Sequence, residues 1–106
     1  MAFTARQNIT TTITQNLIAA GDNAGNIKSI VFCNTNVTTP VKLELHVYRS
    51  GSLFYIVKNR YVYPSETFEL DVSKIAIDTL ANKDSLRIKC SNVSATYPMT
   101  VIINKW

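Results

Sequence analysis

The chain has 106 residues, of which 46% are apolar, and carries a formal net charge of +4. This length suits one domain with one core, and the apolar fraction is higher than that of disordered chains. No apolar run approaches the roughly 18 residues that cross a bilayer, and the N-terminus lacks the pattern of a secretory signal. We therefore expect a single globular domain that neither enters a membrane nor is secreted.

The basic residues are spread from Arg6 to Lys105 and form no run of the kind that follows a phosphate backbone. Their distribution predicts a solvated surface with a mild positive bias and no specific nucleic-acid partner. Attraction to an acidic protein surface or to nucleic acid is the alternative interpretation of the same charge.

The first third of the chain contains an arm and two predicted strands. Residues 1–8 have no periodic pattern and are expected to form an extended N-terminal arm. Residues 9–18 are rich in Thr and Ile, whose branched side chains favour strands, and a polar loop follows at 21–26. Residues 27–33 form the next predicted strand, and its continuous apolar centre predicts burial on both faces.

The central block contains the clearest pattern, a hairpin of two long strands. Residues 41–48 alternate apolar and polar without a break, which is the period of a half-buried strand. Gly51 follows in a turn segment and is able to take the positive φ angle that a tight hairpin needs. The return strand, 53–63, is rich in aromatic residues, and its polar interruption at 58–60 predicts a bulge or two shorter strands.

The last part of the chain supplies three further predicted strands, at 67–72, 85–90 and 99–106. Between the first two, the stretch 71–83 is compatible with a short strand or a helical turn. In total, seven or eight short strands follow one another about every ten residues, and no substantial helix is predicted. The sequence thus predicts an all-β domain over 9–106, built as an antiparallel β-sandwich or jelly roll.

Residues that could carry catalysis are few. His46 is the only histidine, and it shares the polar face of its strand with Glu44. An ion pair or a wet surface position explains it, because a catalytic histidine needs an orienting partner and a nucleophile nearby. Glu69 and Asp71 share a strand face without other signs of a catalytic cleft. We therefore expect that the protein is not an enzyme and has no catalytic residues, no cofactor and no metal site.

The two cysteines, Cys33 and Cys90, lie on separate predicted strands. In a chain without a secretory signal, free buried thiols are expected, and a disulfide between neighbouring strands is the alternative. Neither cysteine has a second metal ligand close by in the sequence, so the pattern does not indicate a metal site.

Aromatic residues indicate a protein-contact surface instead. Tyrosine offers a large contact area with a polar tip and is common at interfaces. Packing between aromatic side chains within the sheet is the other interpretation of the same residues. The candidate interface residues are Phe3, Arg6, His46, Tyr48, Tyr61, Tyr63 and Trp106.

The order of several short motifs resembles that of small virion proteins of tailed bacteriophages. The likeness covers about residues 27–104. Its motifs are an I-x-S-I-x-x-x-N-T strand and turn within 27–36, a V-x-L-x-L-x-V strand at 41–47, a tyrosine-led strand at 55–59, a P-x-x-x-x-E-L turn and strand at 64–70, and a D-S-L-R-I-K strand at 84–89.

This resemblance implies a non-enzymatic structural protein of a phage particle, assembled into the virion in the host cytoplasm. It favours a capsid decoration or cement protein that binds between major capsid subunits, and a head–tail connector or tail-associated protein is the alternative. The implied partner is the major capsid protein or another virion protein, and a homo-oligomer such as a trimer is expected by analogy. A carbohydrate-binding β-sandwich module is a further alternative from another class.

Overall fold

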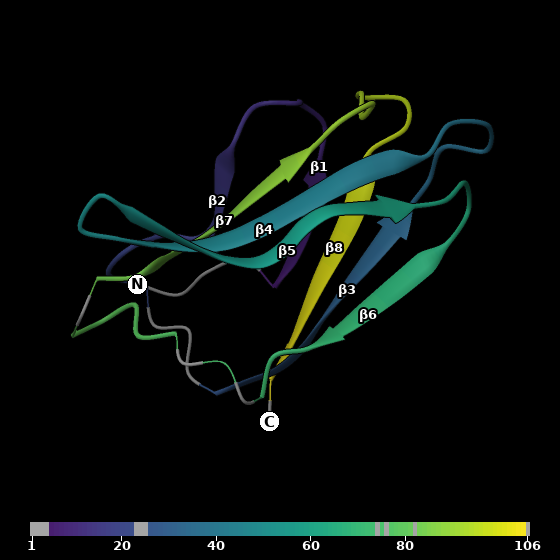
Figure 1. The fold of residues 1–106 in the computed structure, drawn as a ribbon. Coiled ribbons are helices and arrows are strands. Elements are labelled where there is room, and N and C mark those ends of the chain that lie inside the picture. The colour runs from purple at the N-terminus through teal and green to yellow at the C-terminus, as the bar shows by residue number, and fades with distance from the viewer. Residues whose placement is uncertain (1–4, 23–25, 74, 76, 82, 106) are drawn as a thin grey trace.

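The computed structural model describes residues 5–22, 26–73, 75, 77–81 and 83–105. Within these residues the chain forms eight β-strands and no helix, arranged as two antiparallel sheets packed face to face (Figure 1). The predicted all-β sandwich is therefore confirmed. The strands are β1 (Arg6–Ile9), β2 (Gln15–Ile18), β3 (Ile27–Asn34), β4 (Val41–Arg49), β5 (Ser52–Val62), β6 (Thr67–Asp71), β7 (Ser85–Cys90) and β8 (Met99–Lys105).

The order of the strands is that of a jelly roll. Sheet A contains β1, β8, β3 and β6 in this order, and sheet B contains β2, β7, β4 and β5. The pairs β1–β8, β2–β7, β3–β6 and β4–β5 are those of one long hairpin closed by the β4–β5 turn. Rolling up this hairpin places its successive pairs alternately in the two sheets. The sequence left a simple sandwich and a jelly roll open, and the pairing decides in favour of the jelly roll.

The core lies between the sheets and is built from the inward side chains of alternating strand positions. In β4, Val41, Leu43 and Leu45 are fully buried, while Lys42 and Glu44 between them keep contact with solvent. This period of two confirms the predicted half-buried strand. The alternation also fixes the outer face of sheet B, because every second residue of β4 must point away from the core.

The β3 strand is covered on both faces, but unequally. Its inward residues Ile30 and Phe32 are fully buried, and Phe32 stacks on Phe68 of β6 with 5.9 Å between the ring centroids. The outward residues Val31 and Cys33 are only half-buried. The prediction of burial on both faces therefore holds completely for the inner face and partly for the outer one.

The N-terminal region differs from its prediction. Residues 6–8 form β1 together with Ile9 and pair with β8, so the expected boundary of the arm at residue 8 falls inside a strand. The prediction of one strand over 9–18 is wrong, since β1 ends at Ile9 and β2 begins at Gln15 in the other sheet. The Thr-rich sequence of this segment does not indicate that the chain passes from one sheet to the other, because the partner strands, β8 and β7, lie far along the chain.

The β4–β5 hairpin is closed as predicted. Arg49 pairs with Ser52, and the two residues between them, Ser50 and Gly51, have φ angles of 50° and 83°. Two successive positive φ angles are the requirement of a type I′ turn. The predicted bulge in β5 is also confirmed, because the pairing with β4 shifts along its middle and Asn59 takes a φ of 56°. A bulge of this kind protects an edge strand against uncontrolled pairing.

A buried asparagine joins the two sheets at one end of the sandwich. The Asn34 side-chain amide donates to the Val62 carbonyl oxygen in β5 (2.9 Å) and to the Thr39 carbonyl oxygen (3.0 Å). Its own oxygen accepts from the backbone N–H of Asn36 (3.0 Å), whose side chain accepts from the N–H groups of Thr38 and Thr39. The Asn- and Thr-rich connection is therefore a satisfied buried network as well as a turn.

The described residues between β6 and β7 form neither a strand nor a helix. The sequence was compatible with a short strand or a helical turn over 71–83, and apart from Asp71, the last residue of β6, neither is found in the described part of this stretch. The segment is fastened at Asp84, whose fully buried carboxylate accepts two hydrogen bonds from Arg49 and one from the backbone N–H of Asp78 (2.8 Å). The Arg49 guanidinium lowers the pKa of Asp84, and the Asp78 N–H adds to this against the opposite effect of burial.

Candidate protein-contact face

The outer face of sheet B carries a group of aromatic and basic side chains. In this sheet β4 lies between β5 and β7. Residues opposite each other on neighbouring strands share a face, and the register places Tyr55 and Arg87 on either side of His46. We call this surface the aromatic–cationic face; it consists of Lys42, Glu44, His46, Tyr48, Tyr55, Lys58, Tyr61, Tyr63, Arg87 and Lys89.

Three of the four cations on this face lie over aromatic rings. The distances from cation to ring centroid are 3.8 Å for Arg87 on Tyr48, 4.4 Å for Lys58 on Tyr55 and 5.7 Å for Lys42 on Tyr61. Each such contact contributes about 0.5–1 kcal/mol at an exposed site and holds a long side chain against the sheet. The ion pair between Arg49 and Asp84 lies away from this face. Within the described residues none of the four cations of the face forms a salt bridge, and Glu44, opposite Lys89, is the one carboxylate beside them.

His46 lies in the middle of the aromatic–cationic face but is not exposed. Its exposed fraction is 4%, and its ring centroid is 5.5 Å from that of Tyr55. Both ring nitrogens are buried without a hydrogen-bond partner among the described residues. Burial and the charge of Arg87 lower the pKa of His46, against the opposing effect of Glu44. The expected ion pair or wet surface position is therefore wrong, because large neighbours on both adjacent strands cover the ring.

Four predicted interface residues come together on this face, namely His46, Tyr48, Tyr61 and Tyr63. Tyr61 and Tyr63 stack with 6.5 Å between their ring centroids and are still 48% and 59% exposed. Both interpretations of the tyrosines therefore apply, since the rings pack against one another and leave a large area open for contact.

The other predicted interface residues lie elsewhere. Arg6 belongs to β1 and points to the outer face of sheet A, opposite Ile102 of β8. Phe3 and Trp106 fall outside the described residues. The structure therefore does not bring the chain's N-terminal arginine to the tyrosines of the hairpin.

Sequence reasoning missed Tyr55, Lys58 and Arg87 as members of the face. Alternation within 85–90 indicated that Arg87 and Lys89 point outward, and this is confirmed. It gave no sign that β7 pairs with β4, which is what brings these charges beside the tyrosines. The bulge in β5 hid the outward direction of Lys58, because a bulge interrupts the period of two.

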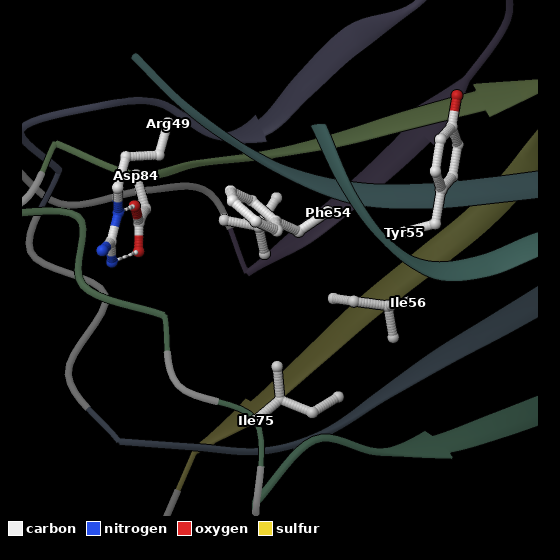
Figure 2. A pocket seen from close by; sticks show the side chains of 7 residues that line it. Arg49, Phe54, Tyr55, Ile56, Ile75 and Asp84 are labelled. Carbon is white, nitrogen blue, oxygen red and sulfur yellow. Dashed lines mark hydrogen bonds and ion pairs between the residues drawn. The ribbon is translucent and has the colours of Figure 1, made fainter. Parts of the chain in front are cut away.

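A groove of about 490 Å³ lies under the free end of the β4–β5 hairpin, on the inner side of sheet B. The hairpin extends past the strands of sheet A (Figure 1), so Phe54 points inward yet remains 58% exposed. Figure 2 shows Phe54, Ile56 and Ile75 around the space, the ion pair to Asp84 at one end, and the Tyr55 ring turned away. Phe54 and Ile56 of β5 therefore line the groove, while Tyr55 between them points to the aromatic–cationic face.

Both cysteines are free thiols, as expected, but the expected burial is met only by Cys90. Cys33 is half-buried on sheet A, while Cys90 is fully buried in the core side of sheet B. Burial raises the pKa of the Cys90 thiol to about 12. Glu69 and Asp71 share the outer face of sheet A, as predicted, opposite Val31 and Ser29 of β3.

Across the described residues, no group of three or more His, Cys, Asp or Glu side chains is arranged to hold a metal ion. In the same part of the chain no helix is long and apolar enough to cross a bilayer. Comparison with known proteins returned no relative, since no family model, no curated protein and no solved structure matches the chain.

Proposed function

We propose that this chain is a non-enzymatic structural protein of a phage particle, in particular a capsid decoration or cement protein that binds between major capsid subunits. The aromatic–cationic face is the surface that meets the partner. Jelly rolls occur in capsid proteins as well as in lectins and other proteins, so the fold is compatible with this role without selecting it. The resemblance of the ordered strand motifs to small phage virion proteins adds the particular biological setting.

One observation carries the proposal. Four residues singled out as interface candidates, from β4 and from β5 with the residue after it, gather on the outer face of sheet B together with Tyr55 and four basic side chains, and of the four His46 is buried. Tyr and Arg are the residue types most enriched at energetically important positions of protein interfaces. The cations stacked on rings also hold the side chains in place before binding, which reduces the entropy that docking would otherwise cost.

A carbohydrate-binding module is less well supported by the same face. Sugars stack on open aromatic faces, but Lys58 and Lys42 already lie over the rings of Tyr55 and Tyr61. A head–tail or tail-associated role uses the same kind of contact surface, so it differs from the decoration role only in where the protein binds.

Binding to isolated phage parts tests the proposal. Purified chain is mixed with heads assembled without it and, separately, with tails, and the bound amount is measured after sedimentation. We expect saturable binding to heads that falls by about 30-fold or more in a Tyr61→Ala/Tyr63→Ala variant, since losing even one interface hot spot costs about 2 kcal/mol. Tyr97→Ala serves as the control, because Tyr97 is also exposed but lies in the loop before β8.

The outcomes separate the candidates. Binding to tails alone would replace the decoration role with the tail-associated one, and binding to neither part would remove the virion proposal. Equal loss in the Tyr97→Ala control would remove the aromatic–cationic face as the contact surface. The oligomeric state of the free chain, expected to be a homo-oligomer such as a trimer, is measured by light scattering on the same samples.

Deleting the whole predicted arm, residues 1–8, would also remove most of β1, so a shorter deletion is needed to test the arm. Deleting residues 1–4 leaves the strand complete and still removes the candidate interface residue Phe3. If the arm contributes to docking on a neighbouring subunit, this variant occupies fewer sites on heads at equal stability. Unchanged occupancy would remove the arm from the proposed interface.

A further inference from the structure

We infer that the aromatic–cationic face docks on a protein surface rich in Asp and Glu side chains, an inference that deepens the proposed function by stating the chemistry of its partner. The sequence alone left a diffuse positive bias, because its basic residues are scattered along the chain. Folding changes this distribution by collecting basic residues from three strands on one sheet face.

The first argument is the local balance of charge. The face holds Lys42, Lys58, Arg87 and Lys89 against a single acid, Glu44. Within the described residues none of these cations forms an ion pair, and three of them rest on aromatic rings instead. A ring holds a cation in place without neutralising it, so the face presents a fixed positive potential that attracts and orients an acidic surface.

The second argument is the contrast with the outer face of sheet A. There Glu69 and Asp71 point outward from β6, beside Lys28, and Arg6 points outward from β1. Both signs of charge are therefore present on that side. The positive excess of the aromatic–cationic face is a property of one side of the molecule and not a general feature of its surface.

His46 at the centre of the face does not itself meet the partner, because its ring nitrogens are buried. The acidic partner therefore contacts the basic side chains and the exposed tyrosines around it.

The same geometry favours a protein over a nucleic acid. Single-stranded nucleic acids bind by stacking bases on open aromatic faces within a continuous basic track. Here the rings of Tyr48 and Tyr55 are capped by Arg87 and Lys58.

Titration with poly-L-glutamate tests the inference with the intact chain. Affinity is measured by calorimetry at low salt, and the binding site is mapped by amide shifts in NMR spectra. The Lys58→Glu/Lys89→Glu variant is compared with Lys83→Glu/Lys105→Glu, which changes the net charge by the same amount at exposed positions away from the face. We expect about a tenfold or greater loss of affinity in the first variant and less than about threefold in the second.

Each outcome bears on the inference. Equal loss in the two variants would show that net charge alone drives the binding and would overturn it. Tighter binding of a thymidine oligonucleotide than of poly-L-glutamate, with shifts at Tyr55 and Arg87, would overturn it in favour of a nucleic acid. Failure to bind phage heads while the two variants still differ toward poly-L-glutamate would remove the proposed function and leave the acidic partner in place.

Discussion

The outer faces of the two sheets are built on the same backbone pattern, yet they carry different side chains. Sheet B presents tyrosines with lysines and an arginine resting on them, around a buried histidine. Sheet A presents small or half-buried residues such as Thr67, Val31 and Thr100, with both signs of charge at its edges. One face thus carries large aromatic contact groups with an excess of positive charge, and the other does not.

This difference indicates that the jelly-roll fold alone does not determine which face carries contact groups. Outside the bulges, the strands of both sheets alternate inward and outward side chains with the same period of two. What distinguishes them is which outward residues the pairing collects from distant parts of the chain. The following four predictions test whether this difference is real and where it matters, from the largest expected effect to the smallest.

The first prediction concerns Asn34, which joins the two sheets and so keeps their outer faces on opposite sides of the domain. Replacing Asn34 with Ala removes three hydrogen bonds and leaves the Val62 and Thr39 carbonyl oxygens without their donor. We expect the free energy of unfolding to fall by about 2–4 kcal/mol, measured by urea denaturation. Asn104→Ala is the control, since its exposed side chain makes one bond, to Ser29. Equal losses would show that Asn34 does not fasten the sheets.

The second prediction concerns the ion pair that holds the segment before β7. The pKa of Asp84 is lowered by Arg49, so its stabilising effect is complete above the unfolded pKa, near 4, and is lost as pH falls through the lower folded value. Asp84→Asn is expected to cost about 1–3 kcal/mol at pH 7 and progressively less in strong acid. Thermal unfolding from pH 7 to pH 2 measures it. A difference that stays constant with pH would contradict the assignment.

Two arginines allow the faces to be compared directly. Arg87 lies on the outer face of sheet B and Arg6 on that of sheet A. Arg87→Gln is expected to weaken binding to phage heads by about tenfold and to reduce its salt dependence, whereas Arg6→Gln changes affinity by less than about twofold. Sedimentation binding at two salt concentrations measures both. The reverse result would move the contact surface to sheet A, where Arg6 was itself an interface candidate.

The smallest expected effect is the titration of His46. Its pKa is lowered in the folded protein, so the unfolded chain binds the proton more tightly. The contribution of His46 to the free energy of unfolding is therefore fully present above the unfolded pKa of about 6.5 and is lost as pH falls below it. His46→Phe keeps an aromatic ring and removes this decrease between pH 7 and pH 5, which thermal unfolding measures. If wild type and variant respond alike to pH, the burial of His46 has no energetic consequence.

Most strands could be predicted because their signals are local. The alternation in 41–48 and 85–90 and the glycine at 51 each act through backbone geometry within a few residues, and all were confirmed. The strand expected at 9–18 was wrong because its two halves pair with β8 and β7, at the other end of the chain. The same limit applied to His46, whose polar position was clear but whose burial depends on Tyr55 and Arg87.

Outside the bulge in β5, the sequence by itself determined which side chains of a strand point the same way, because side-chain direction follows from the pleat of a single strand. It also determined the all-β class, through the number and spacing of such strands. Only the tertiary structure decided which strands are neighbours, because pairing is settled by burial of the whole core and not by any one segment. The aromatic–cationic face depends on this pairing, since its residues come from β4, β7, β5 and the residue after β5, Tyr63, and share a surface only after the hairpin has rolled up.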